Sequence, residues 1–258
     1  MNEMIYYDLK ETSGLPHSLA VQISRELGRR IVAGIYKSKE LIEEENSLAK
    51  RYKVSRSVIR DAVKILVGKG MLELRRGIGT RVRARSEWML LDDDVLAWHQ
   101  SAPVKSDFIK QLIEIRLVIE PKAARWAAER GSLESISVIK KAIEKMEEKK
   151  RSLEDFVMAD ALFHRAVFRA AQNDILTNME GIIFSALLDS IRLTNKDPRE
   201  NENSIVFHRE VAESIFQKNP GRAEFTMEKL LGDAKDRLLI RLPKDQQERI
   251  KSNKKNEN

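Results

Sequence analysis

The segment from Lys53 to Arg85 constrains this chain most, because a helix with paired arginines is followed there by a glycine-rich hairpin. Ser55 predicts the start of the helix, since its hydroxyl can accept a hydrogen bond from an unpaired amide of the first turn. Apolar side chains then recur at intervals of three and four residues and predict one buried stripe: Ile59, Ala62, Val63 and Leu66. Arg56 and Arg60 lie one turn apart on a different face. The helix therefore presents two guanidinium groups away from its own core.

Guanidinium groups at the start of a helix are suited to the major groove of DNA. An arginine fork matches the O6 and N7 acceptors of guanine, and helix-turn-helix proteins present base-reading side chains from the start of their second helix. Ser55 and Ser57 lie beside the two arginines and are further candidate contacts. The competing interpretation is a small structural domain whose arginines are only hydrated.

The hairpin that follows predicts a wing. Short alternating segments flank a pair of glycines, and Arg76 and Gly77 are the candidate contacts at the tip. Glycine lets the backbone come close to a ligand, so such a tip can lie over a phosphate backbone or in a minor groove. Upstream, apolar residues keep helical spacing over residues 17–34, and residues 43–52 open with acids that favour the start of a short helix. The order helix, helix, turn, helix and hairpin predicts a winged helix-turn-helix over residues 17–86.

The charge of the chain is divided unevenly. The net charge is +7, but residues 1–86 hold 18 Lys and Arg against 10 Asp and Glu, whereas residues 87–258 hold 29 against 30. Within residues 50–85 the ratio is 12 to 2. A basic surface of this kind gains affinity for polyanions by releasing their counterions. Double-stranded DNA is the expected partner, and a membrane is disfavoured because no basic amphipathic helix with an aromatic face is evident.

The rest of the chain predicts helices only. Apolar residues keep helical spacing from Lys105 to Arg241, with one predicted helix over Leu176 to Leu193, and no segment alternates like a strand. We therefore expect a mostly α protein, in which a C-terminal all-α antiparallel helical bundle over residues 105–242 follows the winged domain.

Three other segments have their own expected roles. Residues 87–104 should form a linker with a short helix, Asp94 to Gln100, whose tryptophans pack between two domains. Residues 1–16 are predicted to be a flexible arm, and residues 243–258 a disordered tail with too little apolar surface to order itself.

Composition excludes several classes of protein. Because the chain has no cysteine, disulfides, thiolate catalysis and cysteine-ligated metal centres are excluded. No apolar run is long enough to cross a bilayer, and the first ten residues contain charges and tyrosines in place of a signal-peptide core. A cytoplasmic location is expected.

Three polar residues of the helical part form a candidate site. Asp160 and His164 are four residues apart on one predicted helix, so both point to the same side. This spacing suits two ligands of one metal ion, or two contacts to one anion or polyol. His208 opens a later helix. From spacing alone, a satisfied structural pair is the commoner interpretation.

A set of residues between positions 17 and 85 is shared with a known family: Leu48-Ala49, Val54-Ser55-Arg56, Val58, Arg60, Ala62, Leu66, Gly70 and Gly77-Ile78-Gly79-Thr80. This part resembles the DNA-binding domain of the GntR superfamily of bacterial transcription regulators. The resemblance implies that Arg56 and Arg60 contact guanines, and that Arg76 and Gly77 enter the minor groove. Where the family usually has an arginine, this chain has Asn46, so we expect an altered base preference there.

A second set lies in the helical part: Glu114-Ile115-Arg116-Leu117-Val118-Ile119-Glu120-Pro121, Ala123-Ala124-Arg125-Trp126-Ala127-Ala128, Asp160-Ala161-Leu162-Phe163-His164 and Phe207-His208-Arg209. These segments resemble FCD, the ligand-binding domain of the FadR-like branch. The resemblance implies that Arg116 binds an effector carboxylate, and that Asp160, His164 and His208 hold a divalent metal such as Zn, Ni or Mn. The fourth family ligand, a histidine, corresponds to Leu230, which cannot coordinate a metal.

The missing ligand leaves alternatives for this site. Asp160, His164 and His208 hold a metal only if water or the effector completes its shell. They could instead hydrogen-bond the hydroxyls of a polar effector, with Arg116 as the bidentate partner of its carboxylate. Arg116 could also be a structural partner of Glu120, four residues further on.

Within the branch, Leu91 to Trp98 and Ile119 to Arg130 most resemble the galactonate-repressor type, whose members respond to sugar acids. We therefore expect a homodimeric, sequence-specific DNA-binding repressor of a carbohydrate-acid operon, released by a small sugar acid bound in the helical domain. The alternative is a metal-dependent enzyme that uses Asp160, His164 and His208. It is disfavoured because no nucleophile with a partnered base is evident. An architectural DNA binder without sequence preference is a third possibility.

Overall fold

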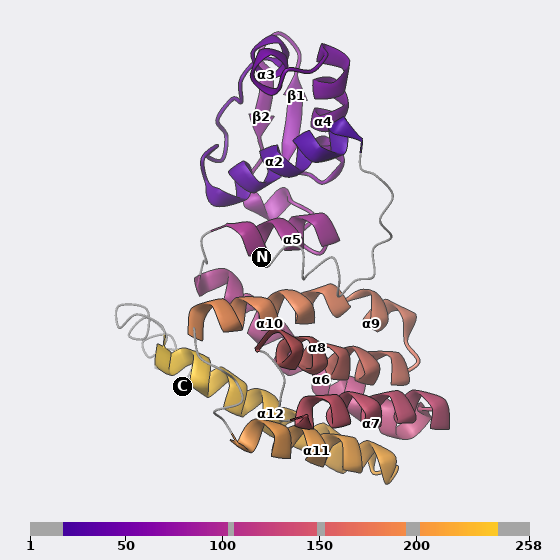
Figure 1. The fold of residues 1–258 in the computed structure, drawn as a ribbon. Helices are drawn as coiled ribbons and strands as arrows, with labels where there is room; N and C mark the ends of the chain where they lie inside the picture. Colours follow the sequence, from indigo (N-terminus) through magenta and orange to yellow (C-terminus); the bar gives the residue numbers. More distant parts are fainter. Residues whose placement is uncertain (1–17, 103–105, 149–152, 195–201, 242–258) are drawn as a thin grey trace. The chain divides into compact units, whose positions relative to one another are not determined.

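The computed structural model describes residues 18–102, 106–148, 153–194 and 202–241 (Figure 1). The chain divides into two compact units, Met1–Pro103 and Val104–Asn258. Both units are built mainly from helices, as the sequence predicted. The predicted flexible arm, residues 1–16, and the predicted tail, residues 243–258, lie outside the described residues.

The first unit is a helix-turn-helix with a two-stranded wing. Its elements are α2 (Leu19–Ala33), α3 (Glu45–Tyr52), α4 (Arg56–Gly68), β1 (Leu72–Arg75), β2 (Gly79–Val82), the 3-10 helix η1 (Arg85–Glu87) and α5 (Asp93–Ser101). The strands pair antiparallel, with Leu72 opposite Val82 and Arg75 opposite Gly79. This order of elements confirms the predicted winged helix-turn-helix (Figure 1).

Local conformations explain where the helices of this unit begin and end. The hydroxyl of Ser55 accepts a hydrogen bond from the amide of Val58 at 3.4 Å and caps α4, as predicted. Lys53 adopts a left-handed conformation, φ 55°, in the turn between α3 and α4. Gly70 follows α4 with φ 71°, and a Cβ added there would lie 2.3 Å from the carbonyl oxygen of Glu87. Glycine is therefore required where the chain leaves α4.

The predicted stripe of α4 forms the centre of the first core. Its four residues, Ile59, Ala62, Val63 and Leu66, each expose 1% of their surface or less. They belong to one cluster with Leu27 and Ile31 of α2, the helix that packs against α4. The arginine face of α4 is left outside this core.

The helix of the expected linker is part of the same core. Asp92 caps α5 and, together with Asp94, binds the ammonium group of Lys69 at 2.6 and 2.8 Å, so α5 is fixed to the end of α4. Trp98 of α5 is buried against α2, where a Cβ added to Gly28 would lie 2.3 Å from the tryptophan ring. The structure differs here from the expected packing between two domains. Trp98 belongs to the core of the first unit because Gly28 leaves space for its ring.

The described part of the second unit is helical throughout. Its helices are α6 (Ser106–Arg130), α7 (Leu133–Glu147), α8 (Leu153–Ala170), α9 (Asp174–Asn178), α10 (Glu180–Thr194), α11 (Glu202–Phe216) and α12 (Pro220–Arg241). Helix α6 packs against α8, α10, α11 and α12, whereas α7 packs against α8 and α11. Helix α6 therefore forms the centre of the bundle. Among the described residues of the chain, no helix combines the length and the apolar character needed to cross a membrane.

One predicted helix proves to be two. The pattern over Leu176 to Leu193 folds as α9 and α10, because the amide of Met179 closes the first helix on the carbonyl of Leu176. The carbonyl of Met179 then accepts the amide of Ile182 in the next helix. Apolar periodicity continues across this change of helix, so the pattern alone could not reveal it.

The contact between Gly28 and Trp98 can be tested by substitution. We predict that Gly28→Ala lowers the free energy of unfolding of the first unit by about 1–3 kcal/mol, because the ring must move to admit a methyl group. Thermal unfolding followed by tryptophan fluorescence measures the effect. Gly68→Ala is the control, since an added Cβ meets no heavy atom within 4 Å there. An unchanged midpoint for Gly28→Ala would contradict the close contact.

Candidate functional site

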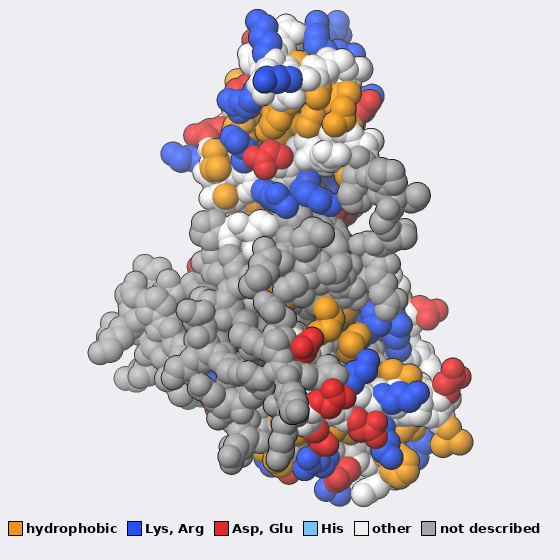
Figure 2. Space-filling model, in the orientation of Figure 1, with side chains coloured by type: hydrophobic (Ala, Val, Ile, Leu, Met, Phe, Trp, Pro, Cys, Tyr) orange, Lys and Arg blue, Asp and Glu red, His pale blue; other side chains and the backbone are white. Residues whose placement is uncertain are grey.

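A cleft in the first unit brings several predicted DNA contacts together. This wing cleft has a volume of about 710 Å³ and is lined by Leu41, Ile42, Glu44, Glu45, Asn46, Arg56 and the segment from Leu74 to Thr80. Four residues that the sequence had singled out are among them: Asn46, Arg56, Arg76 and Gly77. The cleft thus joins the start of α3, the start of α4 and the wing. Figure 2 shows Lys and Arg side chains gathered at the end of the unit where Figure 1 places α3.

Glu45 on α3 links the two arginines of α4. Its carboxylate accepts hydrogen bonds from Nε and Nη2 of Arg60 at 3.4 and 3.1 Å, and lies 3.9 Å from Nη2 of Arg56. The hydrogen bond with Glu45 raises the pKa of Arg60. The side chains of Arg56 and Arg60 are still 62% and 53% exposed, so both charges are presented at the surface. Sequence reasoning missed Glu45, although an acid at the start of the preceding helix was an available signal.

The two serines beside Arg56 are exposed but not free. Their hydroxyl groups hydrogen-bond each other at 2.8 Å, and that of Ser55 also caps α4. Ser55 therefore has a structural role at this helix end, whereas Ser57 keeps a hydroxyl at the exposed face.

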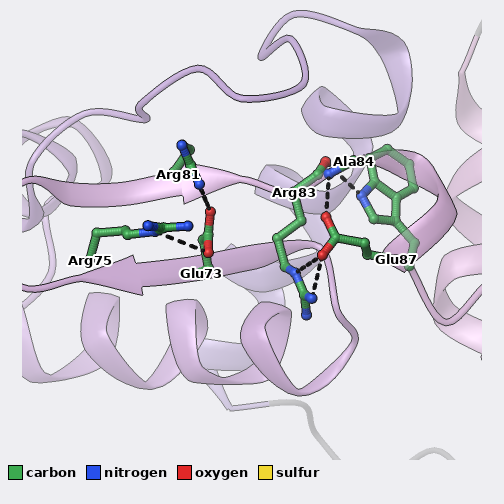
Figure 3. Close-up of polar contacts among 7 residues, drawn as sticks. Glu73, Arg75, Arg81, Arg83, Ala84 and Glu87 are labelled. Carbon is green, nitrogen blue, oxygen red and sulfur yellow. Dashed lines mark hydrogen bonds and ion pairs between the residues drawn. The ribbon is translucent and has the colours of Figure 1, made fainter.

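The arginines of the wing differ in how they are paired (Figure 3). Glu73 on β1 lies between two of them, with its carboxylate 2.6 Å from Nε of Arg81 and 3.2 Å from Nε of Arg75. Hydrogen bonds from Arg81 and Arg75 lower the pKa of Glu73. Arg76 makes no side-chain hydrogen bond or ion pair with the residues that the structure describes. Among the described arginines of the wing strands and their turn, Arg76 is therefore the one whose guanidinium has no acidic partner. It is also the arginine that the sequence predicted as a DNA contact at the tip of the wing.

The second unit contains a buried cluster of five polar side chains. Arg116 and Glu120 come from α6, Asp160 and His164 from α8, and His208 from α11. Asp160 is 15% exposed, and the other four side chains are 7% exposed or less. The Nε2 atoms of His208 and His164 lie 2.7 and 3.6 Å from Oδ1 of Asp160. Packing of α6, α8 and α11 thus brings together all four predicted effector residues, and Glu120 with them.

Contacts on the far side of each ring fix the orientation of both histidines. Nδ1 of His208 lies 2.6 Å from the carbonyl oxygen of Ser204, and Nδ1 of His164 lies 2.5 Å from Oε2 of Glu120. The carbonyl oxygen can only accept, so Nδ1 of His208 carries a proton and donates it, whereas the contact of His164 with Glu120 is an ion pair. Nε2 of His208 faces Asp160, whereas Nε2 of His164 lies 3.6 Å from Oδ1 of Asp160 and 3.5 Å from Nη2 of Arg116. Metal-binding histidines have this arrangement, in which a second acceptor orients the ring.

Glu120 joins the cationic groups of the cluster. Its other oxygen, Oε1, accepts a hydrogen bond from Nε of Arg116, so the pair that the sequence left open does form. Burial raises the pKa of Glu120, but Arg116 and His164 outweigh it and lower the pKa to about 2. Burial lowers the pKa of His164, but Glu120 and Asp160 raise it to about 9. The pKa of Asp160 is lowered because its two histidine neighbours outweigh its burial.

The donor atoms of the cluster fit a divalent metal with three protein ligands. One ligand atom each from Asp160, His164 and His208 lies within 4.8 Å of the others. Two imidazoles and a carboxylate suit Zn, Ni or Mn. Leu230 is buried, at 2% exposed, and has no donor atom, so it adds no fourth ligand. Any further ligand must come from water or from a bound molecule.

The space beside Arg116 is small. A cavity of about 20 Å³, enough for about one water molecule, is lined by Ile113, Arg116, Leu117, Ala186, Leu231, Ala234 and Lys235. These residues belong to α6, α10 and α12. A ligand of several carbon atoms enters only if these walls separate.

The importance of Glu120 for the fold can be measured directly. We predict that Glu120→Gln lowers the free energy of unfolding by about 3–5 kcal/mol, because Arg116 and the protonated His164 lose their shared counter-charge. Glu129→Gln is the matched control. It removes an exposed partner of Arg125 on the same helix and should cost about 0–1 kcal/mol. Equal denaturant midpoints for the two variants would contradict the role given to Glu120.

Comparison with known proteins assigns a family to each unit. Residues 19–82 match the gntR family of bacterial regulatory proteins, and residues 111–233 match the FCD domain. The galactonate operon transcriptional repressor of Escherichia coli K12 is 30% identical over 200 residues, which are 77% of this chain and 87% of that protein. The gluconate operon transcriptional repressor of Bacillus licheniformis is 26% identical over 200 residues, 75% of this chain and 74% of that protein.

A solved structure has the same fold. It is that of Lar, which controls expression of the agr system of Listeria monocytogenes. The TM-score is 0.64 at 19% identity, and the match covers 89% of this chain and 100% of that one. The matched ranges contain both sites, since the residues of the wing cleft lie in the gntR match and the buried cluster lies in the FCD match. The chain therefore belongs to the GntR family of bacterial transcription regulators and carries an FCD domain.

Proposed function

We propose that this regulator represses a sugar-acid catabolic operon, and that a sugar acid bound in the FCD domain releases it from DNA. The names of the galactonate and gluconate operon repressors among its relatives support this effector class. The observation that carries the proposal is the buried cluster around Asp160. Burying an arginine, two carboxylates and two histidines in a helical core is costly compared with apolar packing. A role in binding a polar ligand accounts for that cost.

The DNA-binding half of the proposal rests on the wing cleft. Arg56 and Arg60 read guanines in the major groove, while Arg76 and Gly77 approach the minor groove from the wing. Asn46 offers a neutral amide from the same cleft, and such an amide pairs well with adenine. In a homodimer, two such units face the two half-sites of a near-palindromic operator.

The effector half rests on the polar groups of the cluster. Glu120 accepts a hydrogen bond from Nε of Arg116, and Nη2 lies 3.5 Å from Nε2 of His164, so a sugar-acid carboxylate that binds both terminal nitrogens replaces this second contact. Asp160, His164 and His208 then face its hydroxyl groups. Asp160, His164 and His208 are also the residues that would hold a divalent metal, which would offer a Lewis acid to oxygen atoms of the effector.

Coupling between effector and DNA requires two arrangements of the FCD domain with different effector affinity. The cavity beside Arg116 has room for about one water molecule, so a sugar acid enters that cavity only if its walls separate. We infer that the effector is bound by an arrangement in which α12 moves away from α6 and α10. Repression is relieved if that second arrangement has the lower affinity for DNA.

The alternative of a metal-dependent enzyme is not supported. Both matched families are those of transcription regulators and their ligand-binding domains. We propose effector binding for the residues that an enzyme would use, Asp160, His164 and His208.

Gel-shift titration tests the proposal. Duplexes that the wild-type chain selects from a random library serve as operator, and galactonate and gluconate are added as candidate effectors. We predict that Arg56→Ala and Arg60→Ala each weaken operator binding by about 5- to 100-fold. Arg116→Lys keeps a cation beside Glu120 but loses the bidentate guanidinium, so it should still bind the operator but respond more weakly to the sugar acid.

Arg222→Ala is the control for charge, because Arg222 is an exposed residue of α12 in the second unit. It should leave operator affinity unchanged. Normal operator binding by both Arg56→Ala and Arg60→Ala would refute the DNA-binding half. Operator affinity that no sugar acid alters in the wild-type chain would refute the sensing half.

Metal binding can be measured without DNA. Calorimetric titration of chelator-treated protein with Zn²⁺, Ni²⁺ or Mn²⁺ should show one ion per chain, and His164→Ala and His208→Ala should each remove this binding. His99→Gln is the control, since His99 lies in the first unit. A wild-type chain that binds none of the three ions but does bind a sugar acid would show that the cluster contacts the effector without a metal.

A further inference from the structure

The wing cleft contains an acidic side chain that the fold does not use. Glu44 is the N-cap residue of α3, but its side chain makes no capping hydrogen bond. It is exposed and lines the same cleft as Arg56 and Arg76. With the described residues its side chain makes no hydrogen bond or ion pair. Its carboxylate is therefore available to whatever the cleft binds.

The two neighbouring acids behave differently. Glu45 forms ion pairs with Arg56 and Arg60 of α4. Glu43 accepts a hydrogen bond from the hydroxyl of Tyr36 at 2.5 Å and forms an ion pair with Arg51. Of these three consecutive acids, only Glu44 has a side chain without a partner in the described part of the chain. This contrast separates Glu44 from the structural network at the start of α3.

An unpaired carboxylate on a DNA-binding surface restricts what it can face. It repels phosphate groups, which supply much of the affinity between proteins and DNA. It also repels the O6 and N7 acceptors of guanine and the O4 acceptor of thymine. The major groove offers two amino donors: N6 of adenine, which lies beside the acceptor N7, and N4 of cytosine, which is the one that a glutamate typically accepts from. A carboxylate in this position is therefore both a contact for one base and an obstacle to others.

We propose that Glu44 is a specificity-determining residue, which accepts a hydrogen bond from the N4 amino group of a cytosine in each operator half-site. The cytosine lies near the guanine that Arg56 reads, because both side chains line one cleft. The inference rests on the proposed DNA-reading role of that cleft. It adds a base that the cationic residues cannot recognise, since arginine offers only donors.

Selection from random duplexes tests this inference. The full-length wild-type chain, Glu44→Ala and Glu44→Gln each select duplexes at one salt concentration, and the bound duplexes are sequenced. For the wild-type chain we expect a cytosine at one position of each half-site. Glu44→Ala should lose the preference at that position and keep the rest of the motif. Glu44→Gln should exchange cytosine for adenine there, because an amide binds adenine N6 and N7.

Gel shifts measure how much affinity for DNA depends on this base pair. Replacing the selected C·G pair by T·A should weaken wild-type binding about 5- to 100-fold and leave the affinity of Glu44→Ala unchanged. Glu134→Gln is the charge-matched control, because it removes one exposed acid from the second unit. It should select the wild-type motif.

Three other results would overturn the inference, each in a recognisable way. If Glu44→Ala keeps the whole motif but melts at a lower temperature, the acid only stabilises the start of α3 through the helix dipole. If Glu44→Ala binds every duplex more tightly by the same factor, the carboxylate faces phosphates. If the wild-type chain selects no motif at all, the proposed DNA-reading function fails, and the role of Glu44 fails with it.

Discussion

The shared carboxylate of Glu120 is the interaction on which the FCD domain depends. An arginine and a protonated histidine inside a helical core each require a counter-charge, and this one side chain, with 0% of its surface exposed, serves both. By holding Nδ1 of His164, Glu120 also turns the opposite ring nitrogen toward Asp160. The charge balance of the core and the orientation of the candidate ligand site therefore have the same physical cause. A domain without this carboxylate would need one group to neutralise the buried cations and another to orient the ring of His164.

Carboxylates have a different task in the DNA-binding unit, where they are exposed to water. Glu45 and Glu73 each contact two arginines, but exposed ion pairs of this kind contribute little to stability. Their effect is to restrict where the guanidinium groups point. Pairing also distinguishes the arginines of the wing. Arg75 forms an ion pair with Glu73, whereas the side chain of Arg76 has no ion-pair partner among the described residues. The basic charge counted from the sequence thus overstates the number of cations that are free to meet DNA.

The sequence predicted most of the first unit, since its determinants are local. The cap at Ser55 and the apolar stripe of α4 lie within a few residues of each other, and family resemblance supplied the expected roles of the arginines. The sequence predicted only parts of the buried cluster. Spacing placed Asp160 and His164 on one side of a helix, but only packing could show that Glu120 joins them. The position of Trp98 was mispredicted for the same reason, because an apolar pattern indicates that a residue is buried without identifying its neighbour.

The anchoring of α5 in the first core bears on how such regulators could be recombined. A hybrid made by joining this DNA-binding part to a foreign receptor immediately after the wing would discard Trp98 and leave an unfilled hollow next to Gly28. Lys69 would also lose both of its acidic partners. The smallest part that can be transferred intact is therefore longer than the winged motif. A junction near residue 102 keeps α5 together with the core that it completes. Evolutionary shuffling of these parts faces the same boundary.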